Sequence, residues 1–510
     1  GAAAPTGLNP VGGGGMLGLG LLGAGPLAGI TPHQQQLLAA AQLAGGGVVD
    51  AGLAAQARLS KLNAAAPEVD SATLEKISEV AMQFFIERVP TDEQMREREA
   101  VCSKLHQAVV NEFPSARLQL FGSSGNNFCG KNSDLDLCLI VPEEVVYSDQ
   151  GGGRGGNRRN MGRRETEKRR QQDRKKLMGK FVLRIADVMR RKGMEELTEL
   201  PHARVPIVKF KTRDEQGHLV DCDVCINNYL ACLNTELLFT YSHVDWRLRP
   251  MVYCVKHWIK QRQINDPYKG YLSSYTYTLM CIQFLQQCTP PVLPCLQEIL
   301  RSEAVRRGDP MLRFRNTYDC YFYRDIERLK GFGNANTESI GVLLLKFFRF
   351  YAHFDKKKLV VCIRRGKPLT KKDKGWEKAM QRNRHVFCIE DPFDTDVDLG
   401  RNADENTVND IQQEFERAFK MLSETGDLVK VMESYDTERE GAAPLPPKPA
   451  DDADDHDHDH DHGPPTDEGE TPPITPEGGE PPEQWATGSV EVDVPGVSLP
   501  ADIQILDPSR

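Results

Sequence analysis

An alternation of apolar and polar residues lies between positions 118 and 141. A short apolar segment ends at Gly122-Ser123, a polar loop with glycines follows, and the alternation resumes from Asp134 to Val141. A period of two predicts strands on both sides of the loop. Because side chains on a strand alternate between its faces, Asp134 and Asp136 project from the same face.

Two further strands are predicted at 203–211 and 219–226, joined by a polar turn at 213–217. Asp221 and Asp223 share one face of the second strand. Either of them can therefore bring a third carboxylate to the first two.

Apolar residues recur at helical spacing before and after these strands. The predicted helices cover about 70–85, about 93–112, 237–259, 339–351 and about 408–423. A mixed sheet with helices, followed by a mostly helical region, predicts an α+β fold.

The composition changes at both ends of the chain. Residues 1–66 are rich in Ala and Gly, residues 437–510 are acidic and rich in Pro, and both compositions predict disorder. With 510 residues, 43 Gly, 32 Pro and a hydrophobic fraction of 39%, the folded part is expected to be shorter than the chain. Between the tails we expect a helix within 67–95, a domain with the strands at 96–233 and a helical central domain at 234–436.

The N-terminal region contains an uncharged run, Val11 to Ile30, that has the length of a membrane span. Many Gly residues and Pro26 interrupt the run, and the basic flank of a signal peptide is missing. We therefore expect no membrane association. The absence of an initiator Met suggests a fragment or a processed protein.

The net charge of −9 averages over blocks of opposite sign. Residues 151–176 are thick with Arg and Lys, whereas 451–462 is a run of Asp and His in the acidic tail. Two interpretations explain the basic block equally well. One is a contact with the backbone of a nucleic acid, and the other is a solvated basic loop. The Asp/His run can collect zinc or nickel loosely, although a disordered acidic tail explains it better.

The thirteen cysteines are scattered and mostly lie in apolar runs, as reduced buried thiols do. Cys222 and Cys225 form a CxxC, but these positions point to opposite faces of a strand and cannot share a metal ion. The cysteines therefore predict a reducing compartment, the cytoplasm.

Two carboxylates side by side on a strand repel each other unless a cation lies between them. Mg²⁺ or Mn²⁺ is the expected cation, because such ions are held by carboxylates together with substrate phosphates. The Gly122-Ser123 step adds free backbone N–H groups that attract a phosphate. The combination predicts phosphoryl or nucleotidyl transfer.

The order Gly-Ser, spacer, Asp-x-Asp resembles the nucleotidyltransferase signature of the DNA polymerase beta superfamily. Within it, residues 70 to 435 resemble cytoplasmic poly(A) polymerases of the germline-development type and terminal uridylyltransferases. The resemblance implies a nucleotidyltransferase domain followed by a helical central domain with a poly(A)-polymerase-associated segment. It also makes 149–162 an inserted loop. Asn127 and Cys129 stand where relatives carry Gly, which affects the expected geometry of the loop.

The resemblance also implies the roles of individual residues. Asp134 and Asp136, with Asp223 as the third carboxylate ahead of Asn227-Asn228, would bind two metal ions and be catalytic. The nucleotide-binding residues implied are Gly122, Ser123, Asn228, Asn234, Thr235, Lys256, Lys260, Ser274, Tyr275, Asp391, Asp394 and Val397. Among these, the two lysines and Ser274 would face the triphosphate, and Tyr275 would stack on the base or, alternatively, pack in the core.

The choice of nucleotide depends on Val397. Uridylyltransferases of the family carry a His at this place that hydrogen-bonds uracil and fills the space a purine needs. The alkyl group of Val397 makes no such bond and leaves room for adenine, so ATP is the expected substrate. A gap slipped by one residue would place Asp396 or Asp398 there instead.

We therefore expect a template-independent poly(A) polymerase that adds AMP to RNA 3′ ends. A terminal uridylyltransferase and an inactive scaffold with the same fold remain alternatives. The chain shows no RNA-recognition motif, KH module or zinc finger, so an RNA-binding protein subunit is expected to choose the target RNA.

Overall fold

The computed structural model describes residues 51–65, 68–142, 163–203, 205–379 and 383–435. The loop at 149–162, the acidic tail from 437 and most of the N-terminal tail lie outside the described residues. The expected tail at 1–66 needs one correction, because Ala51–Ala64 forms helix α2. Ala and Leu favour helices, and Ala55 and Leu59 of α2 are buried.

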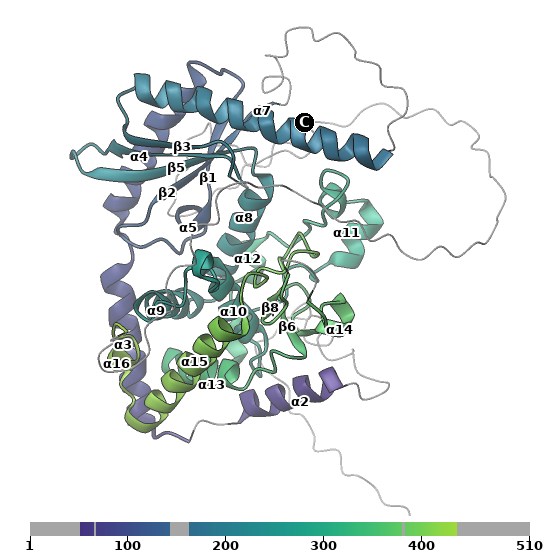
Figure 1. The fold of residues 1–510 in the computed structure, drawn as a ribbon. Coiled ribbons are helices and arrows are strands. Elements are labelled where there is room, and N and C mark those ends of the chain that lie inside the picture. The colour runs from purple at the N-terminus through teal and green to yellow at the C-terminus, as the bar shows by residue number, and fades with distance from the viewer. Residues whose placement is uncertain (1–50, 66–67, 143–162, 204, 380–382, 436–510) are drawn as a thin grey trace, which may run out of the picture. The chain divides into compact units, whose positions relative to one another are not determined.

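A five-stranded mixed sheet forms the first folded region (Figure 1), with strand order β1-β2-β5-β4-β3. β2 and β5 are parallel, and the other neighbours are antiparallel. The strands are β1 (Arg117–Leu120), β2 (Leu135–Ile140), β3 (Glu195–Leu200), β4 (Ile207–Arg213) and β5 (Leu219–Ile226). β1, β2 and β5 match predicted strands closely, and β4 begins four residues later than the strand predicted at 203–211. β3 is an edge strand that the pattern did not predict.

Helices α4 (Asp92–Val110) and α7 (Arg163–Arg191) pack on one face of this sheet. α4 begins with a capping box between Thr91 and Gln94, which satisfies two of the free N–H groups at the helix start. Their apolar residues share one core with every second residue of the strands, including Leu135, Leu137 and Val224. The opposite face of the sheet carries Asp136 and Asp223 beside a smaller buried cluster around Cys138.

The cysteines confirm this separation of faces. Cys222 belongs to the core under α4 and α7, whereas Cys225 lies with Cys138 and Cys232 on the other face. The prediction that the CxxC cannot share one metal ion is confirmed. All thirteen cysteines are free, and all except Cys295 are buried.

The predicted helix at 237–259 is two helices, α8 (Tyr229–Val244) and α9 (Leu248–Gln261). Pro250 lies in the first turn of α9, where its missing N–H costs no helical hydrogen bond. At the break, the Asp245 carboxylate accepts hydrogen bonds from the backbone and the guanidinium of Arg247. The chain therefore changes direction between α8 and α9.

The helical region is built around an aromatic core. Trp258 on α9 packs edge-on against Phe348 of α13 (Ile340–Ala352) and at a tilt against Phe415 of α15 (Glu405–Thr425). Helix α3 (Ser71–Arg88) packs on α9 and α13, so the N-terminal helix joins this region. The remaining helices are α5 (Gly122–Gly125), α10 (Ser274–Gln286), α11 (Arg301–Arg307), α12 (Ile326–Leu329), α14 (Lys371–Lys374) and α16 (Leu428–Val431).

A small second sheet has the order β7-β6-β8. It consists of β6 (Leu359–Val361), β7 (Leu369–Thr370) and β8 (Cys388–Ile389). β8 leads directly into a turn that is closed by an antiparallel bridge between Glu390 and Asp398. Among the described helices, none combines the length and apolar character that crossing a bilayer needs.

Candidate active site

Three carboxylates meet on the face of the large sheet opposite α4 and α7. The parallel register of β2 and β5 places Asp136 directly beside Asp223. Asp134 precedes β2 and projects toward the same face as Asp136, and the charges of Asp134 and Asp223 both act on Asp136. The structure thus brings together the three predicted metal ligands.

The Gly122 turn lies against this carboxylate pair. The backbone N–H of Phe121 donates to the carbonyl of Asp136 at 2.9 Å, and Gly122 has a φ of +64°. A Cβ atom at Gly122 would collide with Oδ2 of Asp136. Only glycine combines this left-handed backbone with so close an approach to a carboxylate. The Gly-Ser step and the Asp-x-Asp strand therefore form one site.

The predicted helix start after Gly122 is a single turn, α5. Its Ser124 is buried, and the Ser124 hydroxyl donates to the carbonyl of Asp134 at 3.0 Å. Ser123 follows Gly122 in this turn. The turn thus connects the residues predicted to bind phosphate to the start of the strand predicted to bind metal ions.

The carboxylates destabilise one another's charge. Burial and the neighbouring charges of Asp223 and Asp134 raise the pKa of Asp136 to about 6. Burial and the charges of Asp221 and Asp223 also raise the pKa of Asp134. Divalent ions fit such a set of oxygen ligands, because a positive charge relieves both desolvation and repulsion. Asp134, Asp136 and Asp223 would hold them.

Lys209 is a site residue that the sequence interpretation missed. It lies opposite Asp223 in the β4–β5 register, and its ammonium forms an ion pair with that carboxylate. Burial opposes the charge of Lys209, but the hydrogen bond and the charge of Asp223 outweigh it and raise the pKa. The amine therefore supplies one positive charge to the three carboxylates.

The raised pKa of Asp136 predicts a pH-dependent stability of the metal-free protein. An acid whose folded pKa lies above its unfolded value stabilises the fold fully below about pH 3.8, and this contribution is lost as the pH rises through about 6. The loss amounts to about 3 kcal/mol for a shift of this size. We expect Mg²⁺ to raise the melting temperature more at pH 8 than at pH 5, as measured by calorimetry. Equal shifts at both pH values, or the same pH-dependent gain in Asp136→Asn, would contradict this.

Arg98 on α4 holds the loop between Gly122 and the metal strand. Its buried guanidinium donates to the Ser124 hydroxyl and to the carbonyls of Lys131 and Ser133, the last at 2.7 Å. One side chain thus fixes both ends of the loop. No local motif marks Arg98, so this role could not be predicted from the sequence.

The same loop is bound to α9 from the other side. The carbonyl of Asn127 accepts a hydrogen bond from Arg249, and that of Cys129 accepts one from the hydroxyl of Tyr253. Asn127 adopts a φ of +69°, a conformation that Asn tolerates better than most residues. Asn127 therefore fits the loop that the structure forms, and Cys129 is buried within the same loop.

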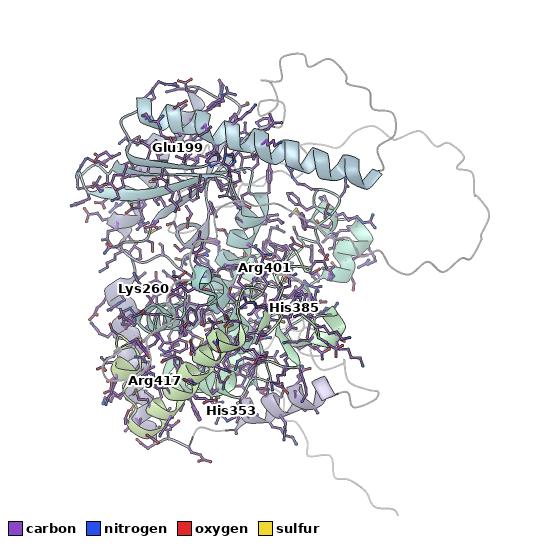
Figure 2. The ribbon with its side chains drawn as sticks, in the orientation of Figure 1. Glu199, Lys260, His353, His385, Arg401 and Arg417 are labelled. Carbon is purple, nitrogen blue, oxygen red and sulfur yellow. The ribbon has the colours of Figure 1, made fainter. Side chains whose placement is uncertain are left out.

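The two predicted lysines of α9 differ in their surroundings. Lys256 donates to the carbonyl of Phe128 at 2.9 Å, and burial lowers its pKa against the opposing charges of Cys129 and Asp136. Lys260, labelled in Figure 2, lies one turn further along α9 and is exposed. The structure therefore places Lys256 beside the carboxylates and leaves Lys260 accessible to solvent.

Asn234, Tyr275 and Asp391 come together from three distant segments. Burial raises the pKa of Asp391 against the hydrogen bonds of its own turn and of Asn234, and burial together with Asp391 raises the pKa of Tyr275. Oδ1 of Asn234 and the Tyr275 hydroxyl are buried and have no hydrogen-bond partner among the described residues. Unpaired buried polar atoms are costly, and a ligand with complementary groups would satisfy them.

The remaining predicted residues lie around this group. Ser274 is the first residue of α10 and directly precedes Tyr275. Asp394 and Val397 lie in the turn after Asp391, where the Val397 N–H donates to the carbonyl of Asp394 at 2.9 Å. Both are partly buried.

Thr235 and Asn228 make hydrogen bonds within the protein that were not predicted. The Thr235 hydroxyl accepts the N–H of Gly122 at 2.9 Å and donates to the carbonyl of Ala231. It therefore fixes the Gly122 turn, instead of being free for a ribose. Asn228 precedes α8, and its N–H donates to the sulfur of Cys138.

Two family models match the chain. Residues 77–243 match "Poly(A) RNA polymerase, mitochondrial-like, central palm domain", and residues 339–397 match "Cid1 family poly A polymerase". Terminal uridylyltransferase cid1 of Schizosaccharomyces pombe is 32% identical over 70% of this chain and 80% of its own length. The chain belongs to the Cid1-like family of poly(A) polymerases and terminal uridylyltransferases.

The chain is similar to poly(A) RNA polymerases as well as to terminal uridylyltransferases. Poly(A) RNA polymerase cid13 of Schizosaccharomyces pombe is 32% identical, and poly(A) RNA polymerase GLD2 of Rattus norvegicus is 28% identical. These matches cover 68% and 70% of this chain. The chain spans 53% of the length of cid13 and 66% of that of GLD2.

Solved structures agree with the family. A cytoplasmic RNA terminal U-transferase superposes with a TM-score of 0.57 at 29% identity, covering 71% of this chain and 99% of that one. A structure of Cid1 gives a TM-score of 0.57 at 30% identity with the same coverage. Cid1 has also been solved with MgGTP bound. The chain is therefore a member of a nucleotidyltransferase family, and a divalent metal with a nucleoside triphosphate is consistent with that family.

Proposed function

We propose that this protein is a poly(A) polymerase that transfers AMP from ATP to the 3′ end of RNA. The observation that carries the transfer chemistry is the Asp136–Asp223 pair on neighbouring parallel strands, with the Gly122 backbone against it. This arrangement joins carboxylates for metal ions to backbone for phosphates. An inactive scaffold would have no need of it, because buried carboxylates that repel each other cost stability.

The proposed reaction gives separate roles to the carboxylates, to the phosphate-facing residues and to the residues near the ribose. Asp134, Asp136 and Asp223 would hold two Mg²⁺ or Mn²⁺ ions, which would supply positive charge to activate the attacking 3′-hydroxyl and to neutralise the triphosphate. Lys256 and Lys260, with Ser123 and Ser274, bind the phosphates and stabilise the charge that moves onto the leaving pyrophosphate. Asn228, which precedes α8, would hold the ribose. Thr235 would act indirectly, because its hydroxyl accepts the N–H of Gly122 and fixes that turn.

The base would lie between Tyr275 and the turn that contains Asp391, Asp394 and Val397. Oδ1 of Asn234 has no partner among the described residues and can accept a hydrogen bond from a ligand. The buried Asp391 carboxylate is a second acceptor. The amino group of adenine is a donor that suits such acceptors. Stacking on Tyr275 contributes about 1 to 3 kcal/mol. Uracil lacks an amino group, and the Val397 side chain offers it no hydrogen bond, which supports ATP.

Val397→His is expected to shift the enzyme toward UTP. The imidazole can hydrogen-bond uracil and occupies space that adenine needs, so the ratio of kcat/KM for UTP to that for ATP should rise by about tenfold. Steady-state kinetics with each nucleotide and a fixed RNA primer measure this ratio. The matched control is Val429→His, which places the same ring on an exposed Val of α16. An unchanged ratio in Val397→His would remove Val397 from the base pocket.

We further propose that the enzyme acts in the cytoplasm on RNA chosen by an RNA-binding protein subunit. The buried free thiols suit a reducing compartment. No segment of the described chain forms a separate RNA-recognition module beyond the sheet and the helical region. Stimulation of primer extension by an added RNA-binding partner would test the second part of this proposal.

A further inference from the structure

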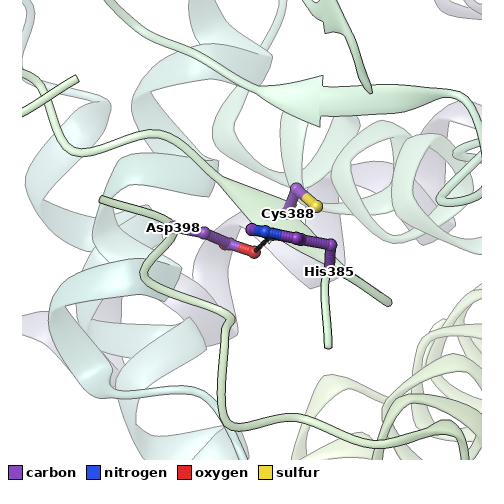
Figure 3. A group of neighbouring side chains, drawn as sticks. All are labelled: His385, Cys388 and Asp398. Carbon is purple, nitrogen blue, oxygen red and sulfur yellow. Dashed lines mark hydrogen bonds and ion pairs between the residues drawn. The ribbon is translucent and has the colours of Figure 1, made fainter. Parts of the chain in front are cut away.

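His385, Cys388 and Asp398 form a buried cluster at the base of the turn that contains Asp391 and Val397 (Figure 3). Their ligand atoms lie within 4.8 Å of one another. The Asp398 carboxylate is engaged by three donors: its Oδ1 accepts the N–H of Ile389 at 3.0 Å and that of Gly400 at 2.9 Å, and its Oδ2 lies 2.8 Å from Nδ1 of His385. His385 therefore carries its proton on Nδ1.

A cation already lies beside this cluster. The Lys371 ammonium donates to the carbonyls of His385 and Val386, and its charge acts on the thiol of Cys388. A metal ion would be repelled by this ammonium and would have to displace the direct His385–Asp398 hydrogen bond. The cluster is therefore a hydrogen-bonded clasp and not a metal site.

The clasp closes the turn that lines the base pocket. The Glu390–Asp398 bridge joins the two ends of the turn. Inside it, the N–H of Asp391 donates to the carbonyl of Val397 at 3.2 Å. Asp398 directly follows Val397, so a displacement of the Asp398 backbone moves Val397 relative to Asp391.

The His385 side of the clasp is held rigidly. Its ring stacks on Trp376 with 5.2 Å between centroids and 9° between planes. His385 itself adopts a φ of +51°, a strained conformation for a residue other than glycine that persists only where surrounding contacts enforce it. A Cβ at Gly400 would collide with the carbonyl of Phe387, so the segments that carry Asp398 and His385 are in direct backbone contact.

We propose that the His385–Asp398 hydrogen bond is a positioning device that fixes Val397 and thereby sets the nucleotide selectivity. This inference rests on the proposed function in placing Val397 at the base. Neither residue touches the carboxylates of β2 and β5, so the bond acts on the choice of base and leaves the metal-dependent step intact. His385 and Asp398 are positioning residues and not catalytic ones.

Two substitutions at His385 separate the hydrogen bond from the ring. His385→Phe keeps an aromatic ring on Trp376 but removes the donor, and His385→Asn keeps an N–H donor close to the position of Nδ1 but removes the ring. We expect the ratio of kcat/KM for ATP to that for UTP to move toward one by about tenfold in His385→Phe. His385→Asn should stay within about threefold of the wild type, and kcat with the preferred nucleotide should change little in both.

His353→Phe is the control for replacing a hydrogen-bonded histidine by phenylalanine elsewhere, at an exposed position of the helical region. His353 also makes an Nδ1 hydrogen bond, to the carbonyl of Arg349 at 2.8 Å, and also packs against an aromatic ring, Phe419. Both histidines are labelled in Figure 2. Assays run well below the melting temperature of each variant should show altered selectivity only in His385→Phe. Equal selectivity in His385→Phe and the wild type would overturn the proposal.

The experiment also distinguishes this proposal from the proposed function. A wild type that prefers UTP would contradict the adenylyl assignment, yet a change of its preference in His385→Phe would still support the positioning role. If His385→Phe does not fold, Asp398→Asn weakens the same bond from the other side, and a ratio changed by less than twofold there would overturn the proposal. Equilibrium titration with non-hydrolysable ATP and UTP analogues gives the ratio independently of turnover.

Discussion

Asp136→Asn is expected to reduce nucleotidyl transfer by about 10³-fold or more at saturating Mg²⁺. The amide removes one of the three carboxylate charges proposed to bind the metal ions. A 10³-fold slower reaction corresponds to a loss of about 4 kcal/mol of transition-state stabilisation. The variant should fold well, because burial and repulsion already disfavour the charge of Asp136 in the metal-free protein. Single-turnover extension of an RNA primer measures the rate.

Asp221→Asn is the matched control for this substitution. Asp221 lies on the same face of β5 two residues before Asp223, but it is exposed. Strand periodicity left Asp221 and Asp223 as alternatives for the third carboxylate, and the family resemblance pointed to Asp223. The β2–β5 register places Asp223 beside Asp136. The control should keep its rate within about threefold. Similar losses in both variants would show that general charge, and not metal ligation, explains the effect.

Gly122→Ala is expected to lower the rate by about 100-fold. The new methyl group would collide with the carboxylate of Asp136 and push it away from Asp223, and a displacement of about 1 Å in an active site can cost this factor. The left-handed φ of +64° adds about 1 kcal/mol of backbone strain. Primer extension and thermal unfolding measure the two effects separately.

Gly193→Ala separates the strain from the collision. Gly193 has a φ of +77°, and a Cβ there would meet nothing within 4 Å. The control should therefore lose a similar amount of stability while its rate stays near that of the wild type. A rate in Gly122→Ala as high as in Gly193→Ala would mean that the Gly122 turn does not position Asp136.

The features predicted correctly from the sequence are those with a local signal. Period-two alternation identified β2 and β5, and the shared face of Asp134 and Asp136 follows from strand geometry alone. β3 was missed because its six residues are Glu195 to Leu200, a mostly polar and exposed edge strand. The break between α8 and α9 was missed because the apolar pattern runs on through it, although Pro250 in the first turn of α9 is typical of a helix start.

The missed site residues depend on register and tertiary contacts. Lys209 could have been found, because the turn at Asp214 to His218 fixes the hairpin register, and counting back from it sets Lys209 opposite Asp223. Arg98 and the His385–Asp398 clasp could not, since each joins segments whose proximity no local pattern encodes. The base pocket similarly needs α8, α10 and the turn after β8 to converge.

The most direct test of the central claim is extension of a labelled oligo(A) RNA in Mg²⁺, with each of the four nucleoside triphosphates offered separately. We expect a ladder with ATP alone, and no ladder when the metal is removed by chelation. A ladder with UTP and none with ATP would contradict the adenylyl assignment. No extension with any nucleotide, even with an RNA-binding partner added, would contradict the enzymatic role itself.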